Sequence, residues 1–171
     1  MEYLTWAQGF GFVSFALGIS VFYQKNDRKL KIIMLILNLN HLVHFLLLGS
    51  IVSALGALLS ALRTATAIYV SSKMVATIFI CIALVSGIWL SDTIWDLWPI
   101  LGTIIGTYSV FVLKGVHMRI GFLGGSTCWL INNILVGSIG GTLLEITVIS
   151  VNIFTILSLQ RGQQQKYVAS K

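Results

Sequence analysis

The sequence predicts an all-α membrane protein with seven transmembrane helices. Three observations support this: an apolar composition, apolar runs of bilayer length, and basic residues confined to alternate connections. Hydrophobic residues make up 57% of the 171 residues and charged residues 9%, and the mean hydropathy is +0.93. Soluble domains carry about 25% charged residues because their surfaces face water. Too few charges remain to cover a soluble surface of this size, so the lipid bilayer is the expected solvent and partner.

Seven apolar runs follow one another along the chain, and each approaches the roughly 20 residues that a helix needs to cross the hydrocarbon core. Two Gly-Ser pairs, Gly49-Ser50 and Gly137-Ser138, mark tight turns inside stretches that would otherwise overshoot the bilayer. The expected spans are Leu4–Tyr23, Ile32–Leu48, Ile51–Val70, Met74–Leu90, Leu97–Leu113, Ile120–Val136 and Ile139–Leu159.

The charged residues of the connections indicate the orientation. One side of the expected membrane holds only the acids Glu2, Asp92 and Asp96, and basic residues concentrate on the cytoplasmic side of membrane proteins. We therefore expect an outside N-terminus and a cytoplasmic C-terminus. The net charge of +6 is then a topology signal, and no nucleic acid is expected as a partner. The basic residues of the other side are Lys25, Arg28, Lys29, Lys31, Lys73, Lys114, Arg119, Arg161, Lys166 and Lys171.

The chain also matches itself after a shift of 88 residues, the separation of Gly49 and Gly137. The shift places Gly18 on Gly106, Gly49-Ser50-Ile51 on Gly137-Ser138-Ile139, and Lys31 on Arg119. It predicts one transmembrane domain over 1–171, in which 1–73 and 91–161 are parallel three-helix repeats, 74–90 is a linker helix and 162–171 a cytoplasmic tail. Parallel repeats place a transporter's substrate site at the repeat interface near the midplane.

This 3+1+3 plan resembles the SWEET and PQ-loop transporter superfamily, although the proline typical of each unit's first helix is present only as Pro99, with Gly11 at the equivalent place. A second resemblance rests on sequence. The stretch from Ser126 to Glu145, STCWLINNILVGSIGGTLLE, looks like the signature of the YgjV family of bacterial inner-membrane proteins. Further fits are Trp6-Ala7-Gln8-Gly9, His44-Phe45, Leu62-Arg63-Thr64 and Lys114-Gly115. This resemblance implies a bacterial inner membrane and no particular activity.

Polar residues at membrane depth are the candidate solute-binding residues, because burying them is costly. His41 and His44 share one helix face, as do Asn40 and His44. Under the 88-residue shift, His41 corresponds to Trp129 and His44 to Asn132. These residues would meet across a central cavity if the repeats pack about an axis. The alternative is that they hydrogen-bond neighbouring helices as structural glue.

One further pair completes the candidate binding set. Asn152, which the shift places opposite Thr64, lies where the resemblance to SWEET-like transporters implies a substrate-binding asparagine.

Two charges lie within the spans. Glu145 and His44 lie at similar depths of roughly 10 Å and 8 Å from the outer surface, so a contact between them could couple proton movement to transport. A static buried pair, or backbone hydrogen bonds near Gly140-Gly141, would explain Glu145 equally well. Arg63 either snorkels or caps a helix towards the cytoplasmic headgroups, or it binds an anionic group.

Three classes of function remain in competition. The first is a transporter or facilitator of a small polar solute (sugar-, nucleoside- or vitamin-like). The second is a receptor or partner-binding protein of the same fold, and a homo-oligomer is left open. The third, an enzyme, is not expected, since no HExxH, GxSxG or acidic cluster for a metal is present. No cofactor and no metal are expected.

Overall fold

A computed structural model describes the backbone of residues 2–22, 27–70, 72–113 and 115–169, and the side chains of 5–21, 28–29, 31–70, 72–113 and 116–157. The described residues form seven α-helices, so the all-α prediction and the number of helices are confirmed. A short 3-10 helix, η1, precedes α5. The elements are α1 (Glu2–Phe22), α2 (Asp27–Leu47), α3 (Ile51–Tyr69), α4 (Lys73–Leu90), η1 (Ile94–Asp96), α5 (Leu97–Val112), α6 (Gly115–Leu135) and α7 (Ile139–Ala169).

Several helices are longer than the apolar runs that predicted them. α2 begins at Asp27 rather than Ile32, and α6 at Gly115 rather than Ile120, because each helix continues through its polar first turn. The backbone of α7 continues to Ala169, so the expected tail 162–171 is helical over most of its length. Hydropathy therefore locates the apolar part of a helix and misses its polar ends.

The two predicted Gly-Ser turns form, and they have the same construction. Gly49 and Gly137 have φ of 74° and 70°, a left-handed conformation that glycine adopts without strain. In the first turn the Ser50 amide donates to the Phe45 carbonyl at 3.0 Å, and in the second the Ser138 amide donates to the Asn133 carbonyl at 2.8 Å. Each turn thus satisfies the last carbonyls of one helix while starting the next.

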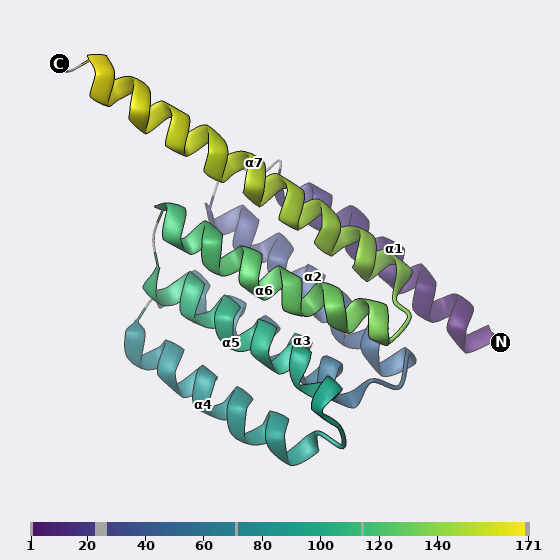
Figure 1. The fold of residues 1–171 in the computed structure, drawn as a ribbon. Helices are drawn as coiled ribbons and strands as arrows, with labels where there is room; N and C mark the ends of the chain where they lie inside the picture. The colour runs from purple at the N-terminus through teal and green to yellow at the C-terminus, as the bar shows by residue number, and fades with distance from the viewer. Residues whose placement is uncertain (1, 23–26, 71, 114, 170–171) are drawn as a thin grey trace.

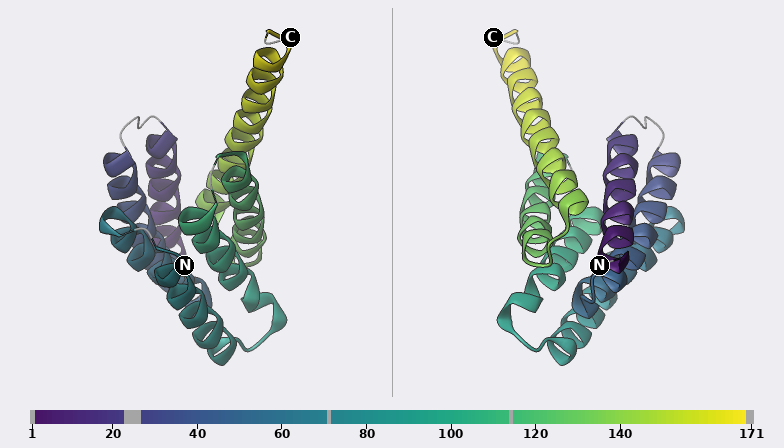
Figure 2. Two further views of the ribbon diagram at one scale, coloured as in Figure 1. Left: turned by 90° about the vertical axis from the view of Figure 1, so that its left-hand side faces the viewer. Right: turned by 90° about the vertical axis from the view of Figure 1, so that its right-hand side faces the viewer.

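The helices form two layers that lean against each other, with α1, α2 and α3 in one layer and α5, α6 and α7 in the other (Figure 1). α1 packs on α7 and α3 packs on α5, which closes the order α1–α2–α3–α5–α6–α7 into a ring. α4 lies outside this ring against α5 and α3. Seen edge-on, the layers are closest near the N-terminus and diverge towards the end that bears the C-terminus (Figure 2).

Glycines set the closest approaches between the layers and within them. A Cβ on Gly140 of α7 would collide with the backbone of Gly11 and Phe12 in α1. In α5, Gly102 lies against Trp129 and the Gly125 carbonyl of α6. These glycines therefore bring helix backbones together, as small residues do in lipid.

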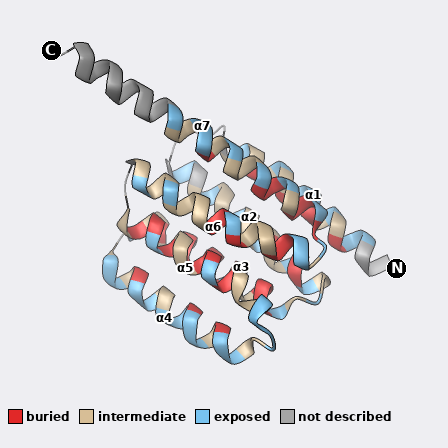
Figure 3. Cartoon of the chain, in the orientation of Figure 1, coloured by how far each residue is buried: buried red, intermediate tan, exposed pale blue. Residues whose placement is uncertain are grey.

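Burial follows a pattern suited to lipid (Figure 3). Among the described buried residues, polar side chains are as frequent as apolar ones, and half of the apolar ones are alanine. Large apolar side chains instead point outwards: Met74, Trp89 and Phe154 are 75%, 83% and 72% exposed. A soluble protein would rarely leave so much apolar surface in water. The surface is therefore built to contact acyl chains.

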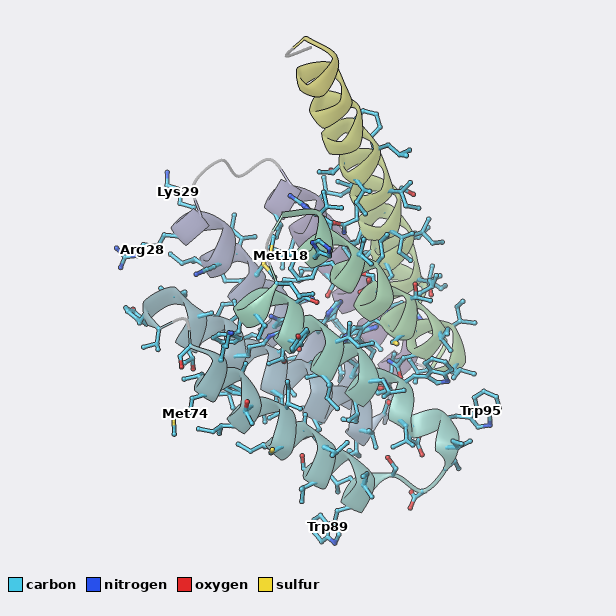
Figure 4. The ribbon with its side chains drawn as sticks, turned by 60° about the vertical axis from the view of Figure 1, so that its left-hand side comes forward. Arg28, Lys29, Met74, Trp89, Trp95 and Met118 are labelled. Carbon is cyan, nitrogen blue, oxygen red and sulfur yellow. The ribbon has the colours of Figure 1, made fainter. Side chains whose placement is uncertain are left out.

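Length and composition alone mark three of the described helices as membrane spans, over Ile51–Tyr69, Lys73–Leu90 and Ile139–Leu157. α1 and α2 contribute the shorter apolar stretches Thr5–Val21 and Lys31–Leu47. The two ends of the bundle differ in chemistry. Arg28 and Lys29 extend from one end, whereas Trp89 and Trp95 lie at the other (Figure 4).

Candidate functional site

The two middle helices of the layers, α2 and α6, carry most of the predicted site residues, and the structure brings them together. The rings of Phe45 in α2 and Trp129 in α6 stack with centroids 5.7 Å apart. Phe45 also contacts the rings of His41 and His44, at 5.5 Å and 5.1 Å. Two histidines and two aromatic rings from opposite layers therefore form one cluster inside the bundle, and Phe45, to which sequence reasoning assigned no binding role, makes the contacts within it. The solute cavity between these helices stays a prediction.

His44 links three helices through both of its ring nitrogens. Nδ1 lies 2.7 Å from the carbonyl oxygen of Ala7 in α1, which can only accept, so Nδ1 carries the proton. In the neutral ring, Nε2 then accepts from the Ser138 hydroxyl of α7 at 2.6 Å. The Ser138 oxygen in turn accepts from the Gly141 amide at 3.1 Å. His44 is fully buried and holds the first turn of α7 against α1.

Asn132 makes the corresponding link from α6 in the second layer to α3 in the first layer. The Ser53 hydroxyl of α3 donates to its Oδ1 at 2.8 Å, and Ser53 also shares a 2.5 Å hydrogen bond with Ser50. Each middle helix thus bonds the third helix of the other layer: α2 reaches α7, and α6 reaches α3. Both links lie beside a Gly-Ser turn, at the end where the layers are closest.

Several buried polar atoms in and beside the cluster of His41, His44, Phe45 and Trp129 have no hydrogen-bond partner among the described residues. They are His41 Nε2, Asn132 Nδ2, and both Oδ1 and Nδ2 of Asn133. Buried polar atoms in proteins are nearly always paired, with protein, water or ligand. The described residues therefore leave part of the hydrogen-bonding capacity of these side chains unused.

Asn40 has a different role from its neighbours on α2. Its Nδ2 donates to the Phe10 carbonyl and the Ser14 hydroxyl of α1, both at 2.7 Å. These bonds join two helices of the same layer. For Asn40 the structure favours the interpretation as structural glue.

Thr64 and Asn152 lie outside the aromatic cluster. Thr64 donates to the Ser60 carbonyl at 2.7 Å and accepts from Asn38 Nδ2 at 3.2 Å. Asn152 donates to the Val148 carbonyl and accepts from Arg119 Nη1 at 3.3 Å. Both residues are buried, and each is engaged within its own layer.

The expected contact between His44 and Glu145 does not form. Both His44 nitrogens are taken by Ala7 and Ser138, while the buried Glu145 carboxyl has the Ser126 side chain of α6 as its polar neighbour. Similar depth in the membrane therefore did not imply contact, because the two side chains point to different neighbouring helices. Glu145 makes no ion pair with any described side chain.

Arg63 stays inside the bundle and does not snorkel to the surface. It is 7% exposed, and its Nη1 donates to the Thr107 hydroxyl at 3.2 Å and to the Thr103 carbonyl at 3.5 Å. Both acceptors belong to α5, so Arg63 crosses the seam between the two layers. Snorkelling is therefore excluded for Arg63. Its bond to a helix carbonyl and the binding of an anionic group are both compatible with this position.

Sequence reasoning assigned no binding role to three residues that the structure makes central. Ser138 was predicted only as part of a turn, and Ser126 was noted only as the start of a family signature. Ser53 was not among the candidate solute-binding residues. The signal was present in the Gly-Ser repeat, since a serine that follows a left-handed glycine begins a helix and turns its hydroxyl inward. Among the described side chains, no three His, Cys, Asp or Glu residues gather as metal ligands.

Seven packed helices, a lipid-facing apolar surface and a buried polar cluster define a polytopic helical membrane protein. Residues 5–163 match the family model Imp-YgjV, described as a bacterial inner membrane protein, and the chain belongs to this family. It is 35% identical over 161 residues to the inner membrane protein YgjV of Escherichia coli K12, covering 93% of this chain and 87% of that protein. No solved structure matches significantly. The predicted location, a bacterial inner membrane, is confirmed.

Proposed function

We propose that this protein transports or facilitates passage of a small polar solute, by alternating access between the unit α1–α3 and the unit α5–α7. In this proposal all seven helices cross the membrane, and α4 is the linker that gives the two units the same orientation. The bonds His44–Ser138 and Ser53–Asn132 carry the proposal. They cross between the units beside the two turns, and the bonds of Arg63 to Thr103 and Thr107 join the units further along the seam of α3 and α5.

The proposed duplication is supported by the pairing of His44 with Asn132 under the shift, although their partners Ser138 and Ser53 lie three positions apart in it, since Ser50 is the residue that matches Ser138. The 88-residue shift exchanges His44 with Asn132 and Ser50 with Ser138, and it exchanges the contact of α1 with α7 for that of α5 with α3. Two units related in this way can rock about their shared seam, which is how parallel repeats produce alternating access.

The proposed orientation places the end that bears the two Gly-Ser turns on the side of the inner membrane away from the cytoplasm. Arg28 and Lys29 lie at the opposite end, where positive residues favour the cytoplasm. Reporter fusions after Lys31, Lys73, Lys114 and Lys171 should all report the cytoplasm. Fusions that place Lys31 and Lys114 on opposite sides of the membrane would remove the parallel repeat and the alternating-access proposal with it.

Uptake into proteoliposomes tests the transport function directly. Purified protein is reconstituted, and labelled sugars, nucleosides and vitamins are screened against empty vesicles. Trp89→Ala provides a matched control, because this side chain is 83% exposed on the lipid-facing surface and should leave uptake unchanged. A solute that binds the protein but never enters the vesicles would favour a receptor of the same fold instead.

Asn132→Leu tests the polar cluster itself. The change keeps the branched shape and the number of heavy atoms but removes the acceptor that Ser53 uses and the free Nδ2 donor. Uptake should fall at least tenfold while the protein still elutes as a single folded species. Unchanged uptake in this variant would show that Asn132 does not line the solute path.

A further inference from the structure

The guanidinium of Arg63 has one edge bonded and one edge free. Its Nη1 faces α5 and donates to Thr103 and Thr107. Its Nε has no partner among the described residues, and no described carboxylate pairs with the cation. A buried charge in a membrane is costly, so a cation without an anion calls for an explanation.

Gly106 makes the space in which this guanidinium lies. Arg63 Nη1 is only 2.9 Å from the position that a Cβ on Gly106 would occupy, and only glycine permits that approach. The hydroxyls of Thr103 and Thr107 donate along their own helix, to the carbonyls of Pro99 at 2.8 Å and Thr103 at 2.6 Å. Because the Thr107 hydroxyl proton is already used, its oxygen turns a lone pair to Arg63.

This arrangement orients the guanidinium. Nη1 is the nitrogen on the far side from the Nε–H bond, so fixing Nη1 on α5 leaves Nε–H and Nη2–H together on the opposite edge. These two parallel donors match the spacing of the two oxygens of a carboxylate, which arginine binds in a bidentate manner. A phosphate dianion fits less well, because one buried cation would leave its second charge uncompensated.

We propose that the free edge of Arg63 binds the carboxylate of an organic acid, and that the transported solute belongs to this chemical class. The inference rests on the proposed transport function and narrows its substrate. Arg63 belongs to α3 and its anchors to α5, so the bound carboxylate lies on the seam between the two units. A solute held there contacts both α3 and α5, and the relative movement of the two units at this seam would carry it across the membrane.

Ligand-induced thermal stabilisation of the purified full-length protein in detergent tests the binding step without transport. The probes are pairs of acids and their amides, namely lactate with lactamide, nicotinate with nicotinamide, and biotin with biotinamide, each at millimolar concentration. At least one acid should raise the unfolding temperature while its amide does not. If no acid exceeds its amide, the proposal is overturned.

Substitutions at Arg63 and Gly106 test whether the acid binds at this guanidinium. Arg63→Gln should abolish the stabilisation, and Arg63→Lys, which keeps the charge but loses the fork, should weaken binding about tenfold or more. Gly106→Ala should weaken it as well by pushing the guanidinium away. Gly124→Ala is the matched control on the neighbouring helix, since its Cβ would meet only Ile105 at 3.7 Å.

The outcomes separate this inference from the proposed transport function. An acid that stabilises the wild type but is not taken up by proteoliposomes leaves the carboxylate site in place and removes transport. A neutral solute that enters wild-type and Arg63→Gln vesicles equally well leaves transport in place and removes the carboxylate site. Equal stabilisation of wild type and Arg63→Gln by the same acid would also overturn the assignment. If Arg63→Gln does not fold, the comparison of Arg63→Lys and Gly106→Ala with Gly124→Ala decides.

Discussion

Gly140→Ala adds one methyl group at the point where α7 crosses α1. The added Cβ would overlap the carbonyl carbon and oxygen of Gly11 and the amide nitrogen of Phe12. All three atoms belong to the backbone, so no side-chain rotation relieves the overlap. The two helices must separate, and the hydrogen bonds of His44 to Ala7 and Ser138 lie beside this crossing.

The expected loss is larger than for an ordinary helix substitution. Overpacking of a well-packed core costs about 1–3 kcal/mol, and separation of α1 from α7 also weakens interhelical hydrogen bonds worth about 0.6 kcal/mol each. We expect a total of about 2–3 kcal/mol, which lowers the ratio of folded to unfolded protein about 30- to 150-fold.

Reversible unfolding in mixed SDS–detergent micelles, followed by far-UV circular dichroism, measures this loss. Gly9→Ala is the matched control on α1, because no atom lies within 4 Å of its added Cβ. The control should remain within about 0.5 kcal/mol of the wild type, as surface changes usually do. If Gly140→Ala and Gly9→Ala unfold at the same detergent composition, the close α1–α7 crossing is wrong.

Three further predictions concern single contacts. A double-mutant cycle of His44→Ala and Ser138→Ala should give a coupling energy of about 0.6 kcal/mol and at most about 1.7 kcal/mol, and no coupling would mean that the 2.6 Å bond does not form. Trp129→Ala should cost about 3–5 kcal/mol by opening a cavity beside Phe45, whereas Trp89→Ala should cost little, and equal losses would contradict the stacking. Lys31→Met removes the 2.5 Å bond from Lys31 Nζ to the Ala67 carbonyl, and urea-assisted unfolding should detect a loss of about 1 kcal/mol that a Lys73→Met control does not share.

The helices and turns followed from the sequence because they depend on local properties. Apolar length predicted the helices, three of which are membrane spans by length and composition, and each Gly-Ser pair predicted the turn at 49 and 137. The meeting of α2 with α6 also followed, since the repeat implied it. Location followed from the signature that begins at Ser126.

The individual side-chain partners could not be predicted in the same way. Depth along a helix follows from residue count, but the direction of a side chain depends on helix rotation, which packing alone determines. Glu145 therefore turned to Ser126 rather than to His44, although the two residues lie at comparable depth. Arg63 likewise turned inward because Gly106 leaves space for it, a relation between two helices that no local pattern contains.

The flank formed by α4 and α5 has a consequence for the surrounding bilayer. At 1.5 Å per residue, the 18 residues of α4 span about 27 Å and the 16 of α5 about 24 Å, against a hydrocarbon thickness of about 30 Å. Apart from Ala76, Ala83 and Gly87, the residues of α4 are at least partly exposed along its length. With α4 and α5 both crossing the membrane, as proposed above, acyl chains beside this flank shorten or tilt to match it, and the annulus of lipid is thinner on that side.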